Sequence, residues 1–289
     1  MNNLFEETRF ILKKYGISAN KNLGQNFLIN ENVVKTIIEK SEITKEDLVI
    51  EIGPGLGTLT KELLESAGKV IAIELDKRMI EILSDRFSSY DNFELINDDV
   101  LKVNLNSIID SNLQFPISNL KKAKIVANLP YYITTPIIMK LLEENLNIKS
   151  ITVMVQKEVA DRLTAIPGKK NTGAITYSVY YYAETEAILT VPKDSFVPEP
   201  SVESEVIRLK IRENPAVNID NKDLMFEIIK YAFMQRRKTL VNSLEKSKIF
   251  ESKMQIIEIL EKLGIDNKIR GEALSLEDFA NIQKYVTKM

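Results

Sequence analysis

Cysteine and histidine are both absent from this sequence of 289 residues. Without cysteine the chain has no disulfide, no thiolate nucleophile and no zinc site built on cysteine. Without histidine it has neither a Ser-His-Asp triad nor a histidine general base. Any reaction must therefore proceed without a group that ordinarily titrates near neutral pH, and we expect no metal site.

Long apolar runs are missing as well. No run approaches the roughly 20 residues needed to span a bilayer, and residues 1–7 lack the basic and apolar regions of a signal peptide. We therefore expect a cytoplasmic protein with no membrane partner. A monomer is the default expectation, because the sequence does not indicate an oligomeric state.

A surplus of positive charge is the third absence. The chain has 39 Lys and Arg against 41 Asp and Glu, with a formal net charge of -2 and an isoelectric point near 5.6. This balance argues mildly against a nucleic-acid partner, because phosphate binding normally requires a basic surplus. Local clusters such as Arg236, Arg237 and Lys238 can still form an RNA-binding patch, although such a cluster is more often only a solvated face.

The stretch 48–57 is the most informative part of the chain. A short apolar run rich in β-branched residues precedes three alternating glycines, Gly53, Gly55 and Gly57. This pattern predicts a buried strand that turns sharply into a helix beginning at Thr58. Glycine accepts positive φ and has no Cβ, so a nucleoside-sized ligand can lie against the main chain of the turn.

The spacing of the glycines discriminates between cofactors. The dinucleotide motif G-x-G-x-x-G needs its third glycine where this chain has Thr58, so a nicotinamide cofactor is disfavoured. Glu74 ends the next apolar run, 21 residues after Gly53, where a parallel strand would present a carboxylate to ribose hydroxyls. With Glu51 two residues before the first glycine, the pattern resembles the first motif of S-adenosylmethionine-dependent methyltransferases. The alternative is a glycine-rich turn that binds no ligand.

Strands and helices alternate from residue 48 onward in the order typical of a parallel sheet. The predicted strands are 48–52, 69–73, 93–96, 123–127 and 150–155, and the predicted helices are 3–15, one from about residue 30, 58–66, 77–88, 135–145 and 157–164. In such a sheet the ligand binds beside the carboxyl ends of the strands. The polar or glycine residues at those ends are Gly53, Glu74, Asp98 with Asp99, and Asn128.

Two of these neighbourhoods allow more than one interpretation. Asp99 can accept a hydrogen bond from the exocyclic amine of adenine, or it can cap a turn; its place at the same sheet edge favours the ligand. Residues 20–28 form an amide-rich loop, and the residues alone favour the N-cap region of the following helix.

The second half of the chain predicts a change of architecture. Segments 176–182, 186–191 and 202–211 are rich in β-forming residues and predict antiparallel strands. Beyond Pro215 the pattern is wholly helical, with predicted helices at 222–234, 236–246, 252–263 and 275–285. We therefore predict two domains, 1–212 and 213–289.

The residues after the fourth predicted strand suggest how an amine could be alkylated. The side-chain carbonyl of Asn128 and the backbone carbonyl of Leu129 can accept hydrogen bonds from a target amine. Pro130 stiffens the turn, and Tyr131 offers a face on which a base can stack for roughly 1 to 3 kcal/mol. Methyl transfer then requires alignment more than acid–base help, which suits a chain without histidine. Taken alone, the tetrapeptide is more commonly a strand terminus with a turn proline and a core tyrosine.

Together these motifs, in this order, resemble the ribosomal RNA adenine dimethyltransferases, and most closely the small-subunit members of that family. The resemblance extends over nearly the whole chain. It rests on the segments 22–28, 51–60, 72–76, 128–131 and 196–204 and on the helical tail with Arg236, Arg237 and Lys238.

The resemblance implies an α/β fold of the Rossmann-like class I methyltransferases, with a mostly parallel seven-stranded sheet, helices on both faces and a smaller helical C-terminal domain that recognises RNA or the ribosome. Residues 1–30 would supply an N-terminal helix and a loop that touches the cofactor. The cofactor would be S-adenosyl-L-methionine. Its implied contacts are Asn26, Leu28, Gly53, Gly55, Glu74, Asp99 and Asn128.

The implied catalytic residues are Asn128, Leu129, Tyr131 and Phe196, with the last two sandwiching a flipped base. The implied activity is dimethylation of the N6 amines of two adjacent adenosines in the 3′-terminal hairpin loop of 16S rRNA, within immature 30S subunits late in their assembly. The implied RNA contacts are Arg236, Arg237 and Lys238. Two alternatives remain: an Erm-type enzyme acting on 23S rRNA, and an assembly factor whose main role is to gate 30S maturation.

Overall fold

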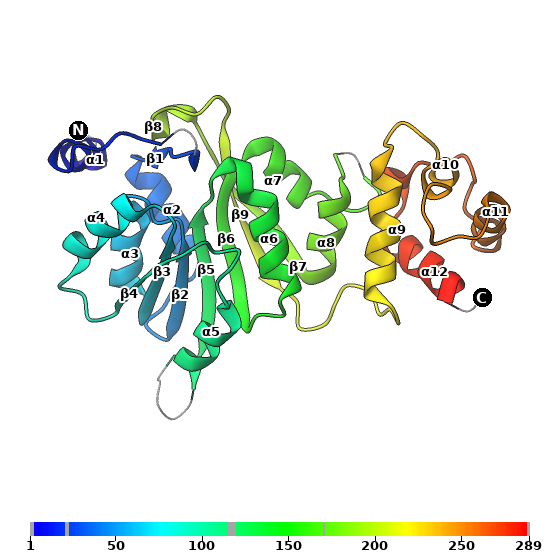
Figure 1. Ribbon diagram of the computed structural model, residues 1–289, viewed down its shortest axis with the longest axis horizontal. Coiled ribbons are helices and arrows are strands. Elements are labelled where there is room, and N and C mark those ends of the chain that lie inside the picture. The colour runs from blue at the N-terminus through cyan, green and yellow to red at the C-terminus, as the bar shows by residue number, and fades with distance from the viewer. Residues whose placement is uncertain (1–2, 21–22, 115–119, 170, 288–289) are drawn as a thin grey trace. The chain divides into compact units, whose positions relative to one another are not determined.

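The computed structural model describes residues 3–20, 23–114, 120–169 and 171–287 (Figure 1). The chain divides into two compact units. The first comprises Met1–Ala160 and Glu186–Ile211, and the second comprises Asp161–Thr185 and Arg212–Met289. Each unit has its own cluster of buried apolar side chains.

A seven-stranded sheet organises the first unit. Its order is β4-β3-β2-β5-β6-β9-β7. The strands are β2 (Asp47–Ile52), β3 (Lys69–Glu74), β4 (Phe93–Asn97), β5 (Lys122–Asn128), β6 (Ile148–Gln156), β7 (Ala183–Val191) and β9 (Ser204–Ile211). The pairs from β4 to β6 are parallel, and β9 lies antiparallel to β6. The predicted mostly parallel sheet is confirmed.

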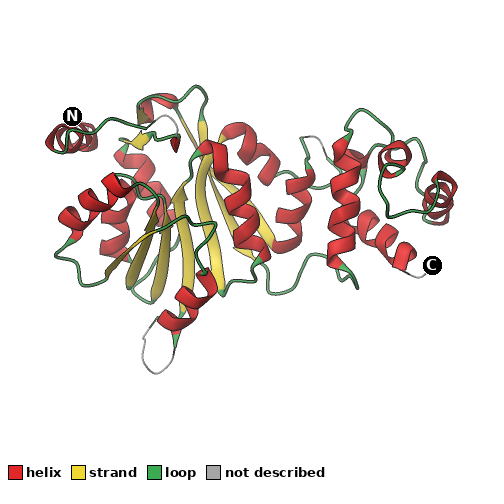
Figure 2. Cartoon of the chain, in the orientation of Figure 1, coloured by secondary structure: helices red, strands yellow, loops and turns green. Residues whose placement is uncertain are grey.

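Helices cover the sheet (Figure 2). Those of the first unit are α1 (Asn3–Lys14), α2 (Glu31–Lys40), α3 (Thr58–Ser66), α4 (Lys77–Phe87), α5 (Leu105–Leu113) and α6 (Thr134–Glu143), and α7 (Lys157–Leu163) follows β6. From β2 the chain runs outward through α3 to β3 and through α4 to β4. It then returns through α5 to β5, on the other side of β2, and continues through α6 to β6. Because such crossovers are right-handed, the two pairs of helices lie on opposite faces. No helix of the described residues is long and apolar enough to cross a bilayer.

The glycine turn between β2 and α3 has the predicted geometry. Gly53, Gly55 and Gly57 have φ values of 66, 58 and 83 degrees, which disfavour residues with a Cβ. At Gly57 a Cβ would also lie 2.5 Å from the ring of Phe87, so close packing against α4 excludes any side chain there. The turn is thus fixed both by its backbone conformation and by its neighbour.

A short second sheet joins two segments that are distant in sequence. β1 (Phe27–Leu28) pairs antiparallel with β8 (Phe196–Val197), so that Leu28 lies opposite Phe196. Sequence patterns did not predict this pairing, because two-residue strands have no periodicity. It holds the amide-rich loop against the segment that precedes β9.

The second unit is helical and is built around buried aromatic residues. Its helices are α8 (Ala174–Tyr182), α9 (Lys222–Met234), α10 (Leu240–Leu244), α11 (Lys253–Lys262) and α12 (Leu276–Thr287). Tyr177 is fully buried; its hydroxyl donates to the carbonyl oxygen of Leu274 at 2.6 Å and its ring meets that of Phe279 edge-on. The hydroxyl is therefore satisfied inside an otherwise apolar core.

Two predictions of local structure were wrong, and one helix was missed. The segment 176–182, predicted as a strand, belongs to α8, because Tyr177 and Tyr181 lie one helical turn apart and both join the second apolar core. For this reason residues 161–185 group with the second unit, rather than with the first as the division after residue 212 implied. The helix predicted at 236–246 is shorter, because Thr239 caps α10. α5 was missed.

Candidate functional site

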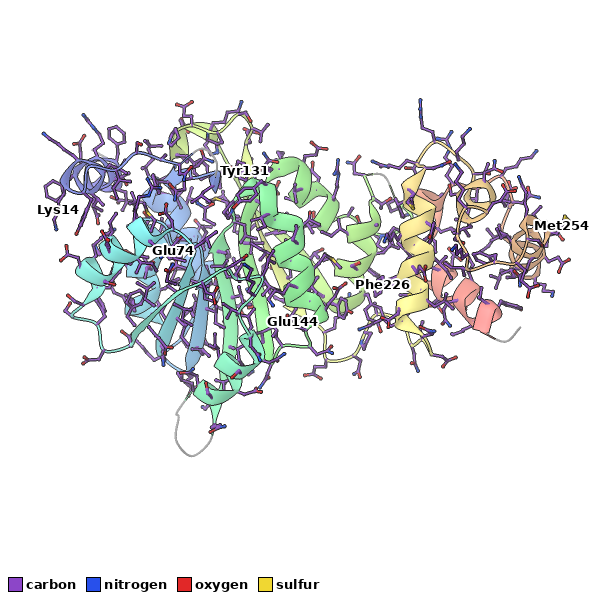
Figure 3. The ribbon with its side chains drawn as sticks, in the orientation of Figure 1. Lys14, Glu74, Tyr131, Glu144, Phe226 and Met254 are labelled. Carbon is purple, nitrogen blue, oxygen red and sulfur yellow. The ribbon has the colours of Figure 1, made fainter. Side chains whose placement is uncertain are left out.

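One pocket lies beside the carboxyl ends of the parallel strands. It has an empty volume of about 1070 Å³, part of it open to solvent. The predicted site residues that line it are Asn26, Leu28, Gly53, Gly55, Glu74, Asp99, Asn128, Leu129 and Tyr131. The predicted convergence of the strand ends on one crevice is confirmed. Glu74 ends β3 and Tyr131 follows β5, and Figure 3 labels both residues. Asn22, part of the resembling loop, lies outside the described residues.

The carboxylate of Glu74 is bound to the glycine turn. One oxygen accepts a hydrogen bond from the backbone N–H of Gly55 at 3.2 Å, and the other accepts from the N–H of Asp76 at 2.8 Å. The side chain is buried, and burial raises the pKa of Glu74, whereas these hydrogen bonds lower it. Both oxygens are therefore held in fixed positions at the wall of the pocket.

A second carboxyl group, that of Glu51, lies beneath the same turn. It is 1% exposed, and its Oε2 accepts a hydrogen bond from the hydroxyl of Thr60 at 2.6 Å. Burial is the main cause that raises the pKa of Glu51 from an ordinary value of 4.5 to about 8; the hydrogen bond from Thr60 lowers it and the nearby Glu74 adds to the rise. Glu51 is thus a neutral acid at neutral pH, whereas the sequence motif suggested only an acidic residue.

Replacing Glu51 with Gln is expected to remove a pH-dependent loss of stability. Between the unfolded-state pKa and about 8, the folded protein keeps the proton on Glu51 and the unfolded chain releases it. Stability of the wild type therefore falls as pH rises through this window, by about 1.4 kcal/mol per pH unit, and levels off above it. Urea denaturation of both proteins between about pH 5 and 8 should show the free energy of unfolding of the variant increasing relative to that of the wild type as the pH rises. Parallel curves would contradict this account.

Asp99 closes a turn and also lines the pocket. Its Oδ1 accepts a hydrogen bond from the N–H of Leu101 at 3.0 Å, which closes a turn after β4. The residue also lines the pocket, beside Asp98 and the half-exposed Leu75. A carboxylate and an apolar side chain at one end of the pocket suit the polar edge and the face of a purine.

Asn128 connects β5 to the amide-rich loop. Its side-chain nitrogen donates to the carbonyl oxygen of Asn26 at 3.3 Å, so its Oδ1 is the atom that it can offer as an acceptor to a ligand. Leu129 follows with its N–H bound to the carbonyl oxygen of Met154 at 3.1 Å. The loop of Asn26 thereby lies in the wall of the pocket, rather than serving only as the N-cap region of α2.

The two predicted aromatic residues are placed differently. Tyr131 lines the pocket, and its hydroxyl lies 2.6 Å from Oγ of Ser204; burial raises its pKa. Phe196 is 1% exposed and packs in the first apolar core, and it is not among the residues that line the pocket. A base sandwich between these rings would require Phe196 to leave its packed position. Tyr132, which the sequence did not single out, is 58% exposed at the pocket.

The predicted RNA-binding cluster lies in the second unit. Arg236, Arg237 and Lys238 are all exposed in the turn between α9 and α10. Arg236 also donates to the carbonyl oxygen of Thr172 at 3.1 Å and lies 3.6 Å from the carboxylate of Glu272. Arg237 and Lys238 are therefore better placed than Arg236 to contact an external phosphate.

Comparison with known proteins decides the family. The model of the ribosomal RNA adenine dimethylase family matches residues 16–288. The ribosomal RNA small subunit methyltransferase A of Bacillus pumilus is 49% identical over 283 residues, covering 97% of this chain and 96% of that protein. Its namesake from Clostridioides difficile is 46% identical over 279 residues, covering 96% and 94%. The chain belongs to the ribosomal RNA adenine dimethylase family.

Solved structures agree on the fold of this dimethylase. A dimethyladenosine transferase from Plasmodium falciparum superposes with a TM-score of 0.75 at 28% identity, covering 91% of this chain and 98% of that one. The 23S rRNA methyltransferase ErmE gives a TM-score of 0.67 at 24% identity, covering 91% and 100%. The predicted class, an S-adenosylmethionine-dependent rRNA adenine dimethyltransferase, is confirmed.

The pocket of the dimethylase fits the cofactor of its family. A Cβ added at Gly53 would have only Pro130 within 4.0 Å, so the turn leaves open space for a ligand against its main chain. The buried carboxylate of Glu74 suits ribose hydroxyls, and the Asp99 end suits an adenine. Among the described residues no group of three or more acidic side chains could hold a metal ion.

Proposed function

We propose that this dimethylase transfers methyl groups to the N6 amines of two adjacent adenosines in the 3′-terminal hairpin loop of 16S rRNA, within immature 30S subunits late in their assembly. The observation that supports this most is the pocket that joins Glu74 and the glycine turn to Asn128 and Tyr131. The high identity to small-subunit methyltransferases favours 16S rRNA over 23S rRNA, because the likeness to ErmE extends to the fold alone. We further propose that it acts as a monomer in the cytoplasm.

The cofactor contacts are proposed residue by residue. Gly53 and Gly55 leave room for the cofactor over the glycine turn, Glu74 accepts hydrogen bonds from its ribose and Asp99 accepts from its adenine amine. Asn26, Leu28 and Asn128 complete the pocket wall near the reacting group. When bound, S-adenosylmethionine supplies an electrophilic methyl group on a sulfonium.

The target amine is proposed to be held by two oxygens. The Oδ1 of Asn128 and the backbone carbonyl oxygen of Leu129 accept from its two N–H groups, which directs the nitrogen lone pair toward the pocket. These acceptors need no change of protonation, so the reaction proceeds in a site without histidine and the proton leaves after transfer. Tyr131 stacks on the flipped base, and Phe196 joins it only if its ring moves out of the core.

The helical residues 213–289 are proposed to recognise RNA. Replacing Arg237 and Lys238 with Glu is expected to weaken binding to small subunits, and to lower the salt dependence of binding by about one unit of slope for each phosphate that the variant no longer neutralises. Within the part of the chain that the structure describes, neither side chain has a hydrogen bond or ion pair like those of Arg236, so the fold should be unaffected. Filter binding over a range of salt concentrations measures both effects. Unchanged affinity and slope would identify the cluster as a solvated face.

The proposed function is tested with purified protein and labelled S-adenosylmethionine. The substrates are immature 30S subunits and 50S subunits from a strain that lacks both modifications, and mass mapping locates the modified nucleosides. Dimethylation of two adjacent adenosines near the 3′ end of 16S rRNA supports the proposal. Transfer only to 23S rRNA would replace it with the Erm-type activity. Undisturbed subunit maturation in cells with an inactive variant would exclude methylation as its main role and favour the assembly-factor alternative.

A further inference from the structure

The last turn of α4 contacts both the glycine turn and the N-terminal helix. Three consecutive residues, Asp85, Arg86 and Phe87, make these contacts. Phe87 packs against Gly57, as described above. Asp85 accepts hydrogen bonds from the ammonium group of Lys14 at 2.8 Å and from the hydroxyl of Tyr15, so it holds the end of α1.

Arg86 connects the two sides directly. Its Nη1 donates to the carbonyl oxygen of Leu56, within the glycine turn, and its Nη2 forms an ion pair with Glu7 of α1. The side chain of Arg86 is only 16% exposed and that of Glu7 is 30% exposed. The guanidinium also lies over the ring of Phe87, 5.2 Å from its centroid. A planar, forked cation can make these three contacts together, whereas a lysine ammonium cannot.

The opposite edge of the glycine turn carries the proposed ribose contact. Gly55, one residue before Leu56, donates its N–H to Glu74. A shift of the Leu56 carbonyl group would therefore displace the N–H that orients the carboxylate. Leu56 and Gly55 also line the pocket. Arg86 on α4 therefore donates a hydrogen bond to one side of the turn, and Glu74 on β3 accepts one from the other side.

We propose that Arg86 and Glu7 are positioning residues for cofactor binding: α1, by fixing Arg86, holds the glycine turn in the conformation that receives the cofactor. This inference rests on the proposed function and deepens it. Ile11 of α1 is buried in the first apolar core and Thr8 is buried as well, so α1 can transmit a constraint to that turn.

Binding of S-adenosylhomocysteine, the product form of the cofactor, tests the proposal without turnover. In the full-length protein, Arg86→Lys is expected to raise the dissociation constant about tenfold, because a lysine cannot contact Leu56 and Glu7 together. Glu7→Gln is expected to raise it about threefold, because Arg86 keeps its contact with Leu56 and loses only the charge of its partner. The KM for S-adenosylmethionine should rise in parallel, with kcat changed less than about twofold, because the methyl acceptor site is untouched. Calorimetry and steady-state kinetics measure these effects.

Asp85→Asn is the matched control. It weakens the attachment of α1 through Lys14 and Tyr15 but leaves the contact of Arg86 with Leu56 in place. The dissociation constant of this variant should stay within about twofold of wild type, even where its melting temperature falls as far as that of Arg86→Lys. Hydrogen exchange at the Gly55 and Gly57 amides should accelerate in Arg86→Lys and not in Asp85→Asn.

Two outcomes would overturn the inference. One is unchanged affinity in Arg86→Lys, and the other is an equal loss in Asp85→Asn, which would make α1 a general stabilising element. If the wild-type protein itself failed to bind S-adenosylhomocysteine, the proposed function would be contradicted, and the inference that rests on it as well. Normal binding by wild type with no effect of Arg86→Lys would leave the proposed function standing.

Discussion

Replacing Asn128 with Ala should reduce methyl transfer at least about a hundredfold while changing the affinity for S-adenosylhomocysteine only a few-fold. In the proposed function the Oδ1 of Asn128 is the side-chain acceptor next to the Leu129 carbonyl, so its removal is expected to leave the target amine without this orienting contact. The loss should fall on kcat rather than on the KM of the cofactor. Single-turnover transfer to small subunits measures the first quantity, and calorimetry measures the second.

A matched asparagine separates orientation from structure. Asn106 on α5 also donates its side-chain amide to a backbone carbonyl, that of Glu144 at 3.0 Å, and lies outside the pocket. Asn106→Ala should lose comparable stability and keep full transfer. An Asn128→Ala variant whose cofactor affinity fell as far as its activity would show that Asn128 serves the cofactor rather than the target amine.

The parts of the site that the sequence predicted are those with local signals. Three alternating glycines after an apolar run define the turn, because only glycine combines positive φ with the close approach of Phe87. Glu74 and Asn128 were found because each ends a strand, and parallel strands present their carboxyl ends at one edge of the sheet. The roles assigned to these residues remain predictions.

The parts that the sequence could not predict depend on contacts distant in the chain. The segment 176–182 has the Thr, Tyr and Val content of a strand, yet it is helical because its tyrosines fill a core supplied by residues beyond 215. The burial of Phe196 follows from its pairing with β1, 168 residues earlier at Leu28. Arg86 belongs to no sequence motif, and its proposed role is visible only from its contacts with Leu56 and Glu7 in the folded protein.

The protonation state of Glu51 could not be predicted from the sequence. A sequence motif shows that a residue is acidic, but its protonation depends on the exposed area and the hydrogen bonds of the folded state. Glu51 and Glu74 line the same pocket, and only Glu74 receives backbone N–H groups on both oxygens. This difference makes Glu74 the better candidate for an ionised ribose acceptor, and Glu51 a natural control for it.

Glu74→Gln is therefore expected to weaken binding of S-adenosylhomocysteine about thirtyfold to a hundredfold at pH 8, because two charge-assisted hydrogen bonds to hydroxyls are lost. The glutamine NH₂ group must also face the N–H of either Gly55 or Asp76, so it cannot replace the carboxylate. Glu51→Gln makes the same change beneath the same turn. It should alter affinity less than about twofold at pH 7, where that group is already neutral.

The pH dependence of binding gives this prediction a second test. Burial raises the pKa of Glu74 in the free protein, and a protonated carboxyl group accepts hydrogen bonds less strongly. The affinity of wild type should thus be highest at pH values above this raised pKa and fall as the pH is lowered through it, whereas Glu74→Gln should lack that decline. Calorimetric titrations from about pH 5 to 8 measure both curves. Affinities of Glu74→Gln and wild type that agree within about threefold at pH 8 would remove Glu74 from the proposed ribose contact.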